Sequence, residues 1–277
     1  MEKMLIRVAH SPDSDDAFMF YALATERLPT GPYRFRHVLE DIESLNRKAV
    51  RGEYEVTAVS IHAYAYISDK YALLPSGASM GERYGPIVVA RRPFAPSELR
   101  GKTIGIPGLL TSAYLALKLF EPDFKALAIS FDQIMDAVQK GHVDAGLLIH
   151  EGQLTYVQEG LHKVVDLGEW WNDETKLPLP LGGNAIRRDL GLEHVHEISR
   201  LLRESIRYAL DHREDALQHA LRYARDLSQK QADQFVGMYV NRRTLDYGPE
   251  GRAAVQMFLD RAYAAGLIPH PIIPEFV

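Results

Sequence analysis

The feature that most constrains the fold is an alternation of short apolar runs with segments of helical periodicity. Residues 5–9 and 56–59 are strand candidates, and helical patterns at 15–24 and 42–50 lie between them. Gly52 follows the second pattern, at a position where a left-handed residue commonly ends a helix. Strands and helices that alternate in this way form a mostly parallel sheet covered by helices. The sequence therefore predicts an α/β fold.

Part of this pattern occurs again further along the chain. Residues 133–139 predict a helix, Gly141 follows it as Gly52 follows the earlier helix, and the apolar run 143–149 comes next. When the two glycines are aligned, Glu55 lies opposite Asp144, and residue 61 lies opposite His150. The likeness predicts two related lobes, but a match this short also arises by chance.

Two interrupted segments are candidates for crossovers between the lobes. Residues 87–91 lead into the proline-bearing stretch 92–96, and the proline- and glycine-rich stretch 177–183 precedes residues 184–188. We expect a large lobe of residues 1–95 plus 186–277, with a small lobe of residues 96–185 inserted between the two hinge strands. Helical patterns predominate beyond Leu190 and predict an outer cover for the large lobe.

The composition excludes several classes of partner and chemistry. A formal net charge of −5 provides no basic field to attract nucleic acid or an anionic membrane surface. The absence of cysteine excludes disulfides, thiolate nucleophiles and cysteine-based metal sites. The first apolar run is too short for a signal peptide, and no later run approaches the roughly 20 residues of a membrane span. We therefore expect a cytoplasmic protein whose partner is a small molecule.

Polar residues follow four of the predicted strands. In open α/β sheets, ligands bind at the carboxyl ends of strands, where the N–H groups of the next helix are free. Two strand ends belong to each expected lobe, so a cleft between the lobes would gather all four: residues 10–16, 60–62, 111–113 and 150–151.

Each strand end also has a plainer interpretation. Asp13, Ser14, Asp15 and Asp16 most often cap a helix and complement its dipole, with direct ligand contact as the alternative. Ser60, Thr111 and Ser112 are ordinary N-cap residues, although such residues also present donors that bind a carboxylate. His194 and His196 lack a third ligand, so we predict no metal site. Trp170 and Trp171 are more often packing residues than a ligand platform.

His150 closes the apolar run 143–149. It is either a core histidine bonded to the backbone or a general base at the mouth of the cleft. Its ordinary pKa of about 6.5 suits base catalysis at neutral pH. We expect Glu151 to open the next helix, because it would face away from His150 if the strand continued.

Four segments, taken in order and spacing, resemble the 1,4-dihydroxy-6-naphthoate synthases (the MqnD family) of the futalosine route to menaquinone. The resemblance covers nearly the whole chain, and it rests on residues 10–18, 39–46, 146–151 and 170–182.

The resemblance implies a two-lobed fold like that of type II periplasmic solute-binding proteins. It implies a lyase that converts cyclic dehypoxanthine futalosine to 1,4-dihydroxy-6-naphthoate with release of a three-carbon fragment, without metal or organic cofactor. The catalytic histidine of the family falls on His150, and its substrate contacts fall on Ala58, Val59, Ser60, Ser112 and Ala113.

Further substrate-binding candidates are Thr111, Asn46, Asp41, His10 and Asp16. His10 is the least secure of these, because some family members differ in the first loop. A second proton carrier, if one assists His150, is a choice among Tyr114, Asp41 and Asp16.

Two alternatives remain at the level of sequence. One is a solute-binding protein for a small organic anion, and the other is the sister enzyme that dehydrates chorismate. We expect a monomer or a weak homodimer.

Overall fold

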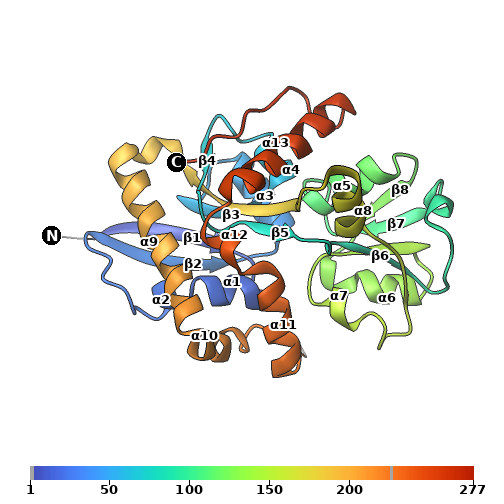
Figure 1. Ribbon diagram of the computed structural model, residues 1–277, viewed down its shortest axis with the longest axis horizontal. Coiled ribbons are helices and arrows are strands. Elements are labelled where there is room, and N and C mark those ends of the chain that lie inside the picture. The colour runs from blue at the N-terminus through green and yellow to red at the C-terminus, as the bar shows by residue number, and fades with distance from the viewer. Residues whose placement is uncertain (1–2, 225–226) are drawn as a thin grey trace.

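The computed structural model describes residues 3–224 and 227–277 and contains two β-sheets, each with its own helices (Figure 1). The first sheet has the order β2-β1-β3-β11-β4, with β5 also paired to β11. Its strands are β1 (Met4–His10), β2 (Tyr33–Leu39), β3 (Val56–Ser60), β4 (Tyr71–Leu73), β5 (Ser79–Gly81) and β11 (Leu179–Arg187).

The second sheet has the order β10-β6-β9-β7-β8. Its strands are β6 (Ile87–Ala90), β7 (Thr103–Ile106), β8 (Lys125–Ala128), β9 (Ala145–Leu148) and β10 (His162–Asp166). Figure 1 shows the two sheets in separate halves of the molecule, so the predicted α/β fold with two lobes is confirmed.

Helices connect and cover both sheets. The early ones are α1 (Ser14–Met19), α2 (Tyr21–Ala24), α3 (Ile42–Val50), α4 (Ile61–Tyr64), α5 (Ser112–Phe120), α6 (Ile134–Gln139), α7 (Gly152–Thr155) and α8 (Leu167–Thr175). The later ones are α9 (Leu192–Asp211), α10 (Arg213–Ala220), α11 (Gln229–Tyr239), α12 (Arg242–Leu245) and α13 (Gly248–Ala264). Short 3₁₀ turns are η1 (Pro96–Leu99), η2 (Phe131–Gln133) and η3 (Arg188–Leu190). None of the helices in the described ranges has the length and apolarity that a membrane crossing requires.

The repeat seen in the sequence is a repeat of structure. In the first sheet β1 pairs in parallel with β2 and β3, and in the second β7 pairs in parallel with β8 and β9. Gly52 and Gly141 both have positive φ, 71° and 74°, just after α3 and α6. Glu55 accepts a hydrogen bond from the backbone N–H of Arg7 in β1, as Asp144 does from Thr103 in β7. The two lobes therefore carry the same β-α-β unit.

The helix predicted at 15–24 is divided into α1 and α2, which is a correction. Phe20 interrupts it with φ −95° and ψ 7°. The buried hydroxyl of Ser205 on α9 donates to the Met19 carbonyl and accepts from the Leu23 N–H, so it replaces one bond of the helical ladder. A side chain inserted into the ladder in this way bends a helix.

The chain changes sheet between β5 and β6 and again between β10 and β11. The proposed division at residues 95 and 185 stays a prediction, but these changes show that β6 belongs to the second sheet and β11 to the first. One buried apolar cluster spans both halves and includes Val59, Leu147 and Trp171. Trp171 is fully buried and donates its Nε1–H to the Pro178 carbonyl, which confirms the packing role.

Gly168, at the start of α8, packs against the first crossover, the segment between β5 and β6. A Cβ at this position would overlap the backbone carbonyl of Tyr84, which lies between β5 and β6. We expect Gly168→Ala to lower the free energy of unfolding by about 1–3 kcal/mol or more, because backbone must move to admit the methyl group. Urea denaturation measures the effect.

Gly152→Ala is the matched control, because its Cβ would meet nothing closer than 3.5 Å. That variant should stay within about 1 kcal/mol of wild type. Equal stability of the two variants would contradict the close packing at Tyr84.

Candidate active site

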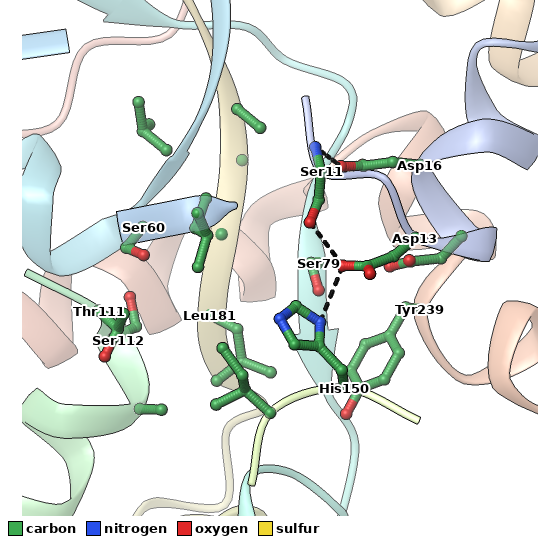
Figure 2. A pocket seen from close by; sticks show the side chains of 18 of the residues that line it. Ser11, Asp13, Asp16, Ser60, Ser79, Thr111, Ser112, His150, Leu181 and Tyr239 are labelled. Carbon is green, nitrogen blue, oxygen red and sulfur yellow. Dashed lines mark hydrogen bonds and ion pairs between the residues drawn. The ribbon is translucent and has the colours of Figure 1, made fainter. Parts of the chain in front are cut away.

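A cavity lies between the two sheets and is lined from both lobes (Figure 2). All four predicted strand ends contribute to its wall: Ser11, Asp13, Asp15 and Asp16 after β1; Ala58, Val59 and Ser60 in β3; Thr111, Ser112 and Ala113 after β7; and Ile149 and His150 after β9. The prediction that one cleft gathers these strand ends is therefore confirmed. Parallel strands of the two repeated units end at the same cavity, and this topology explains the convergence.

His150 of the second lobe is bound directly to Asp13 of the first lobe, on one side of the cavity. Its Nδ1 lies 2.8 Å from Asp13 Oδ2, which also accepts a 2.5 Å hydrogen bond from the Ser11 hydroxyl. The Phe131 ring packs edge-on against the imidazole, with ring centroids 4.3 Å apart. Asp13 stands at the N-cap position of α1, but its side chain makes no capping bond, so the capping interpretation of this residue is wrong. Asp13 orients the histidine instead.

The second ring nitrogen of His150 points into the cavity. Nε2 is buried and has no hydrogen-bond partner among the described residues, and Figure 2 shows it facing the side on which Ser60 and Ser112 lie. With Nδ1 held by a carboxylate, the Nδ1–H tautomer is favoured, which leaves the lone pair on Nε2. The geometry is that of an oriented base.

The pKa of His150 departs from the ordinary value assumed from sequence. Burial by itself lowers this pKa, but the Asp13 carboxylate, together with smaller effects of Glu151 and Asp15, more than offsets burial and raises it. The protonated ring is therefore stabilised. Neutral His150 accepts a proton more readily than an ordinary histidine does.

The carboxyl groups of Asp15 and Asp16 line the cavity on the same side as Asp13, and both residues are half-buried. Burial, followed by the neighbouring carboxylates, raises the pKa of Asp15 well above its usual range. Burial and the charge of Asp13 raise the pKa of Asp16 to about 7, although the Ser11 N–H bonds to its Oδ2. Such groups hold protons near neutral pH.

Asp13, His150 and Glu151 form a possible group of metal ligands in the described part of the chain, with one ligand atom from each lying within 4.8 Å of the others. The Nδ1–Oδ2 distance is that of a direct hydrogen bond, and Oδ2 also accepts from Ser11. We interpret the group as an ion pair with a neighbouring acid, and the absence of metal and cofactor stays a prediction. Glu151 lies just before α7, as expected.

Hydroxyl groups lie across the cavity from His150 (Figure 2). Thr111 caps α5, because its Oγ1 accepts from the Tyr114 N–H and donates to the Gly108 carbonyl. Ser112 Oγ accepts from the backbone N–H of His62. Ser60 makes no capping bond, and its hydroxyl accepts from Asn46 instead. The capping prediction is thus confirmed for Thr111 and wrong for Ser60.

Three predicted substrate-binding residues, His10, Asp41 and Asn46, do not line the cavity. His10 is buried and bonds through Nε2 to His37 Nδ1 at 3.0 Å. Asp41 caps α3 by accepting from the Ser44 N–H, and Asn46 is bonded to Ser60. Tyr114 does not line the cavity either.

Sequence reasoning did not single out several residues of the wall. They come from β5, β11 and α11 and the segments beside them, and include Ser79, Asn184, Phe235 and Tyr239. Tyr239 donates its hydroxyl to Gln153 on α7 and so links the two lobes. These residues carry no local signal, because only tertiary packing brings them to the cavity.

The comparisons with known proteins agree with this site. A family model described as "Menaquinone biosynthesis" matches residues 6–264. The chain belongs to this family. A curated relative from Thermus thermophilus is 42% identical over 98% of the chain and 99% of its own length. Another from Streptomyces coelicolor is 39% identical over 95% of each chain. Both relatives are named as 1,4-dihydroxy-6-naphthoate synthases, so this member of the menaquinone-biosynthesis family resembles enzymes.

Solved structures extend the comparison. Protein AF1704 from Archaeoglobus fulgidus has a TM-score of 0.92 and 50% identity, over 95% of this chain and 98% of its own. The alkanesulfonate-binding protein of Xanthomonas axonopodis has a TM-score of 0.75 at 12% identity, over 99% of this chain and 97% of its own. The second likeness shows the fold alone, which is the predicted periplasmic-binding-protein fold.

The hydrogen-bonded pair of the buried His10 and the half-buried His37 predicts a loss of stability in acid. Burial, followed by the neighbouring imidazole, lowers the pKa of His10 to about 3, and burial lowers the pKa of His37 to about 4. Since the unfolded chain binds protons below about pH 6.5, stability contributed by these neutral rings is complete above that pH. It decreases from pH 6.5 down to about pH 4 for His37 and to about pH 3 for His10, by up to about 1.4 kcal/mol per pH unit for each histidine.

His37→Gln removes one of these two groups. Urea unfolding at pH 7.5, 6 and 5 should show a shallower decrease in this variant than in wild type. His196→Gln, at an exposed position, should keep the wild-type slope. An unchanged slope in His37→Gln would mean that His37 is not buried in its neutral form.

Proposed function

We propose that the protein is a lyase that converts cyclic dehypoxanthine futalosine to 1,4-dihydroxy-6-naphthoate and releases a three-carbon fragment. The observation that carries the proposal is the Asp13–His150 pair, with Nε2 of His150 facing a cavity that spans both lobes. The names of the relatives from Thermus thermophilus and Streptomyces coelicolor support the product, and the resemblance noted in the sequence supports the substrate.

In the proposed first step, Nε2 of His150 removes a proton from a carbon next to a carbonyl group of the substrate. The electron pair of that C–H bond passes into the carbonyl group, and elimination of the three-carbon fragment follows as the ring becomes aromatic. Asp13 stabilises the imidazolium that forms, as the buried aspartate of a Ser-His-Asp triad stabilises the catalytic histidine.

The opposite wall provides the groups for binding. The hydroxyls of Ser60 and Ser112 and the N–H groups at the start of α5 suit a carboxylate or a developing enolate. Asp16, whose raised pKa is about 7, lines the same cavity and is our candidate for the group that returns a proton. Walls from two lobes exclude water once ligand is bound.

The direct test is incubation of the purified protein with the cyclic substrate, followed by chromatography of the naphthoate. His150→Ala should reduce turnover by at least about a hundredfold, because the base is lost, while calorimetry still detects substrate binding. Full activity of His150→Ala would overturn the mechanism. Wild-type protein that binds substrate without converting it would indicate a solute-binding protein, and consumption of chorismate would indicate the sister dehydratase.

Asp13→Asn separates the role of the carboxylate from that of the base. We expect kcat to fall by about a hundredfold, because the imidazolium loses its counter-ion and the tautomer is no longer fixed. The acid limb of the pH profile of kcat/KM should also move to lower pH, because Asp13 raises the pKa of His150.

Asp144→Asn is the control, because Asp144 binds backbone in β7 and does not line the cavity. It should leave both kcat and the acid limb in place. An Asp13→Asn enzyme with a wild-type pH profile would show that Asp13 does not set the proton affinity of His150.

A further inference from the structure

Asn46 lies on α3, is completely buried and contacts both lobes. Its Oδ1 accepts the backbone N–H of Ser60 at 2.9 Å. Its Nδ2 donates to Ser60 Oγ at 3.0 Å and lies 3.4 Å from the carbonyl oxygen of Leu110, between β7 and α5. The conspicuous motif at residues 39–46 therefore ends in a side chain that touches the cavity wall from behind.

The orientation of the Asn46 amide follows from its partners. A backbone N–H only donates and a backbone carbonyl only accepts, so Oδ1 faces Ser60 N and Nδ2 faces Leu110 O. Nδ2 therefore also faces Ser60 Oγ, which must accept. No other hydrogen bond of this hydroxyl is present among the described residues, so its proton is available toward the cavity that Ser60 lines.

A second contact of α3 strengthens the same connection. Glu43 Oε2 accepts the backbone N–H of Leu110 at 3.0 Å, so α3 binds both backbone groups of that residue. Leu110 directly precedes Thr111, the N-cap of α5. A Cβ on Gly108 would overlap the Glu43 carboxylate, which shows how closely the two segments approach. α3 thus fixes the end of β3 relative to the start of α5.

We propose that Asn46 is a positioning residue that holds the Ser60 hydroxyl as a hydrogen-bond donor for the carboxylate of the substrate. The identity of the substrate rests on the proposed function. An ionised carboxylate only accepts hydrogen bonds, so a hydroxyl binds it by donating its proton. Ser60 accepts from Asn46 and Ser112 accepts from the His62 N–H, and neither hydroxyl donates to another group in the described part of the chain. Both protons can therefore bind one anion beside the N-terminus of α5.

Asn46→Asp tests the proposal with almost no change in volume. A carboxylate oxygen in place of Nδ2 would accept the proton of Ser60 and turn the lone pairs of that hydroxyl toward the ligand. We expect KM to rise about tenfold or more while kcat stays close to wild type, because a bond made equally to substrate and transition state is lost. A decrease confined to kcat would contradict the proposal.

A double-mutant cycle separates the hydroxyl from simple charge repulsion. If Asn46 acts through Ser60, Asn46→Asp should add little to the rise in KM once Ser60→Ala is present. Direct repulsion of the ligand by the new charge would persist in that background, and fully additive effects would overturn the proposal. Asn46→Ser, neutral and smaller, takes the place of Asn46→Asp if thermal unfolding shows that the latter does not fold.

Asn172→Asp on α8 is the matched control. Asn172 also donates to a backbone carbonyl, that of Leu177, but it does not line the cavity or contact a hydroxyl of its wall. The same amide-to-carboxylate change should leave KM unaltered there. A rise in KM equal to that of Asn46→Asp would attribute the effect to a general loss of stability.

Titration calorimetry with 2-naphthoate, an aromatic carboxylate, distinguishes this proposal from the proposed function. Wild-type protein that binds 2-naphthoate about tenfold or more tighter than Asn46→Asp, but does not convert the cyclic substrate, would support the role of Asn46 and overturn the lyase. The opposite result is that wild type converts the cyclic substrate, while Asn46→Asp has the same KM and the same affinity for 2-naphthoate as wild type. It would support the lyase and overturn the role of Asn46. A wild-type protein that shows neither turnover nor binding would overturn both.

Discussion

The bond between Asp13 and His150 is the interaction on which the site depends. Asp13 follows β1 of the first sheet and His150 follows β9 of the second, so the pair exists only when the two lobes are correctly placed. The bond fixes the ring, sets its tautomer and raises its pKa. The crossovers, the shared apolar cluster and the Tyr239–Gln153 bond all hold the two halves in the arrangement that this pair requires.

Much of the fold could be predicted from the sequence, because strands and helices depend on local patterns of apolar residues. The apolar runs and helical spacing predict the α/β fold. The helix–glycine–strand pattern at Gly141, which repeats the one at Gly52, predicts the repeat that the paired strands confirm. Strand ends followed by polar residues predicted the wall of the cavity, since the strands of both repeated units point to it. His150 ends one of these strands, so the same pattern predicts its place at the cavity.

The remainder of the site could not be predicted because it depends on contacts distant in the sequence. The sequence predicts Asp13 as a helix cap, but the approach of β9 from the other lobe gives its carboxylate His150 as a partner. Asn46 looked like a ligand contact, but its buried amide is used by Ser60. Tyr239 comes from the C-terminal helices, whose periodicity predicted cover and carried no sign of a cavity.

The break between α1 and α2 connects the acidic side of the cavity to α9, which lies outside the cavity. The hydroxyl of Ser205 joins the two helices at the break, and the first turn of α1 carries Asp15 and Asp16, which line the cavity. α9, a helix that contributes no residue to the cavity, therefore binds the far end of the helix on which these carboxyl groups stand. We expect changes on that face of α9 to shift the carboxyl groups, and with them the pKa of His150, without altering any residue that meets the ligand.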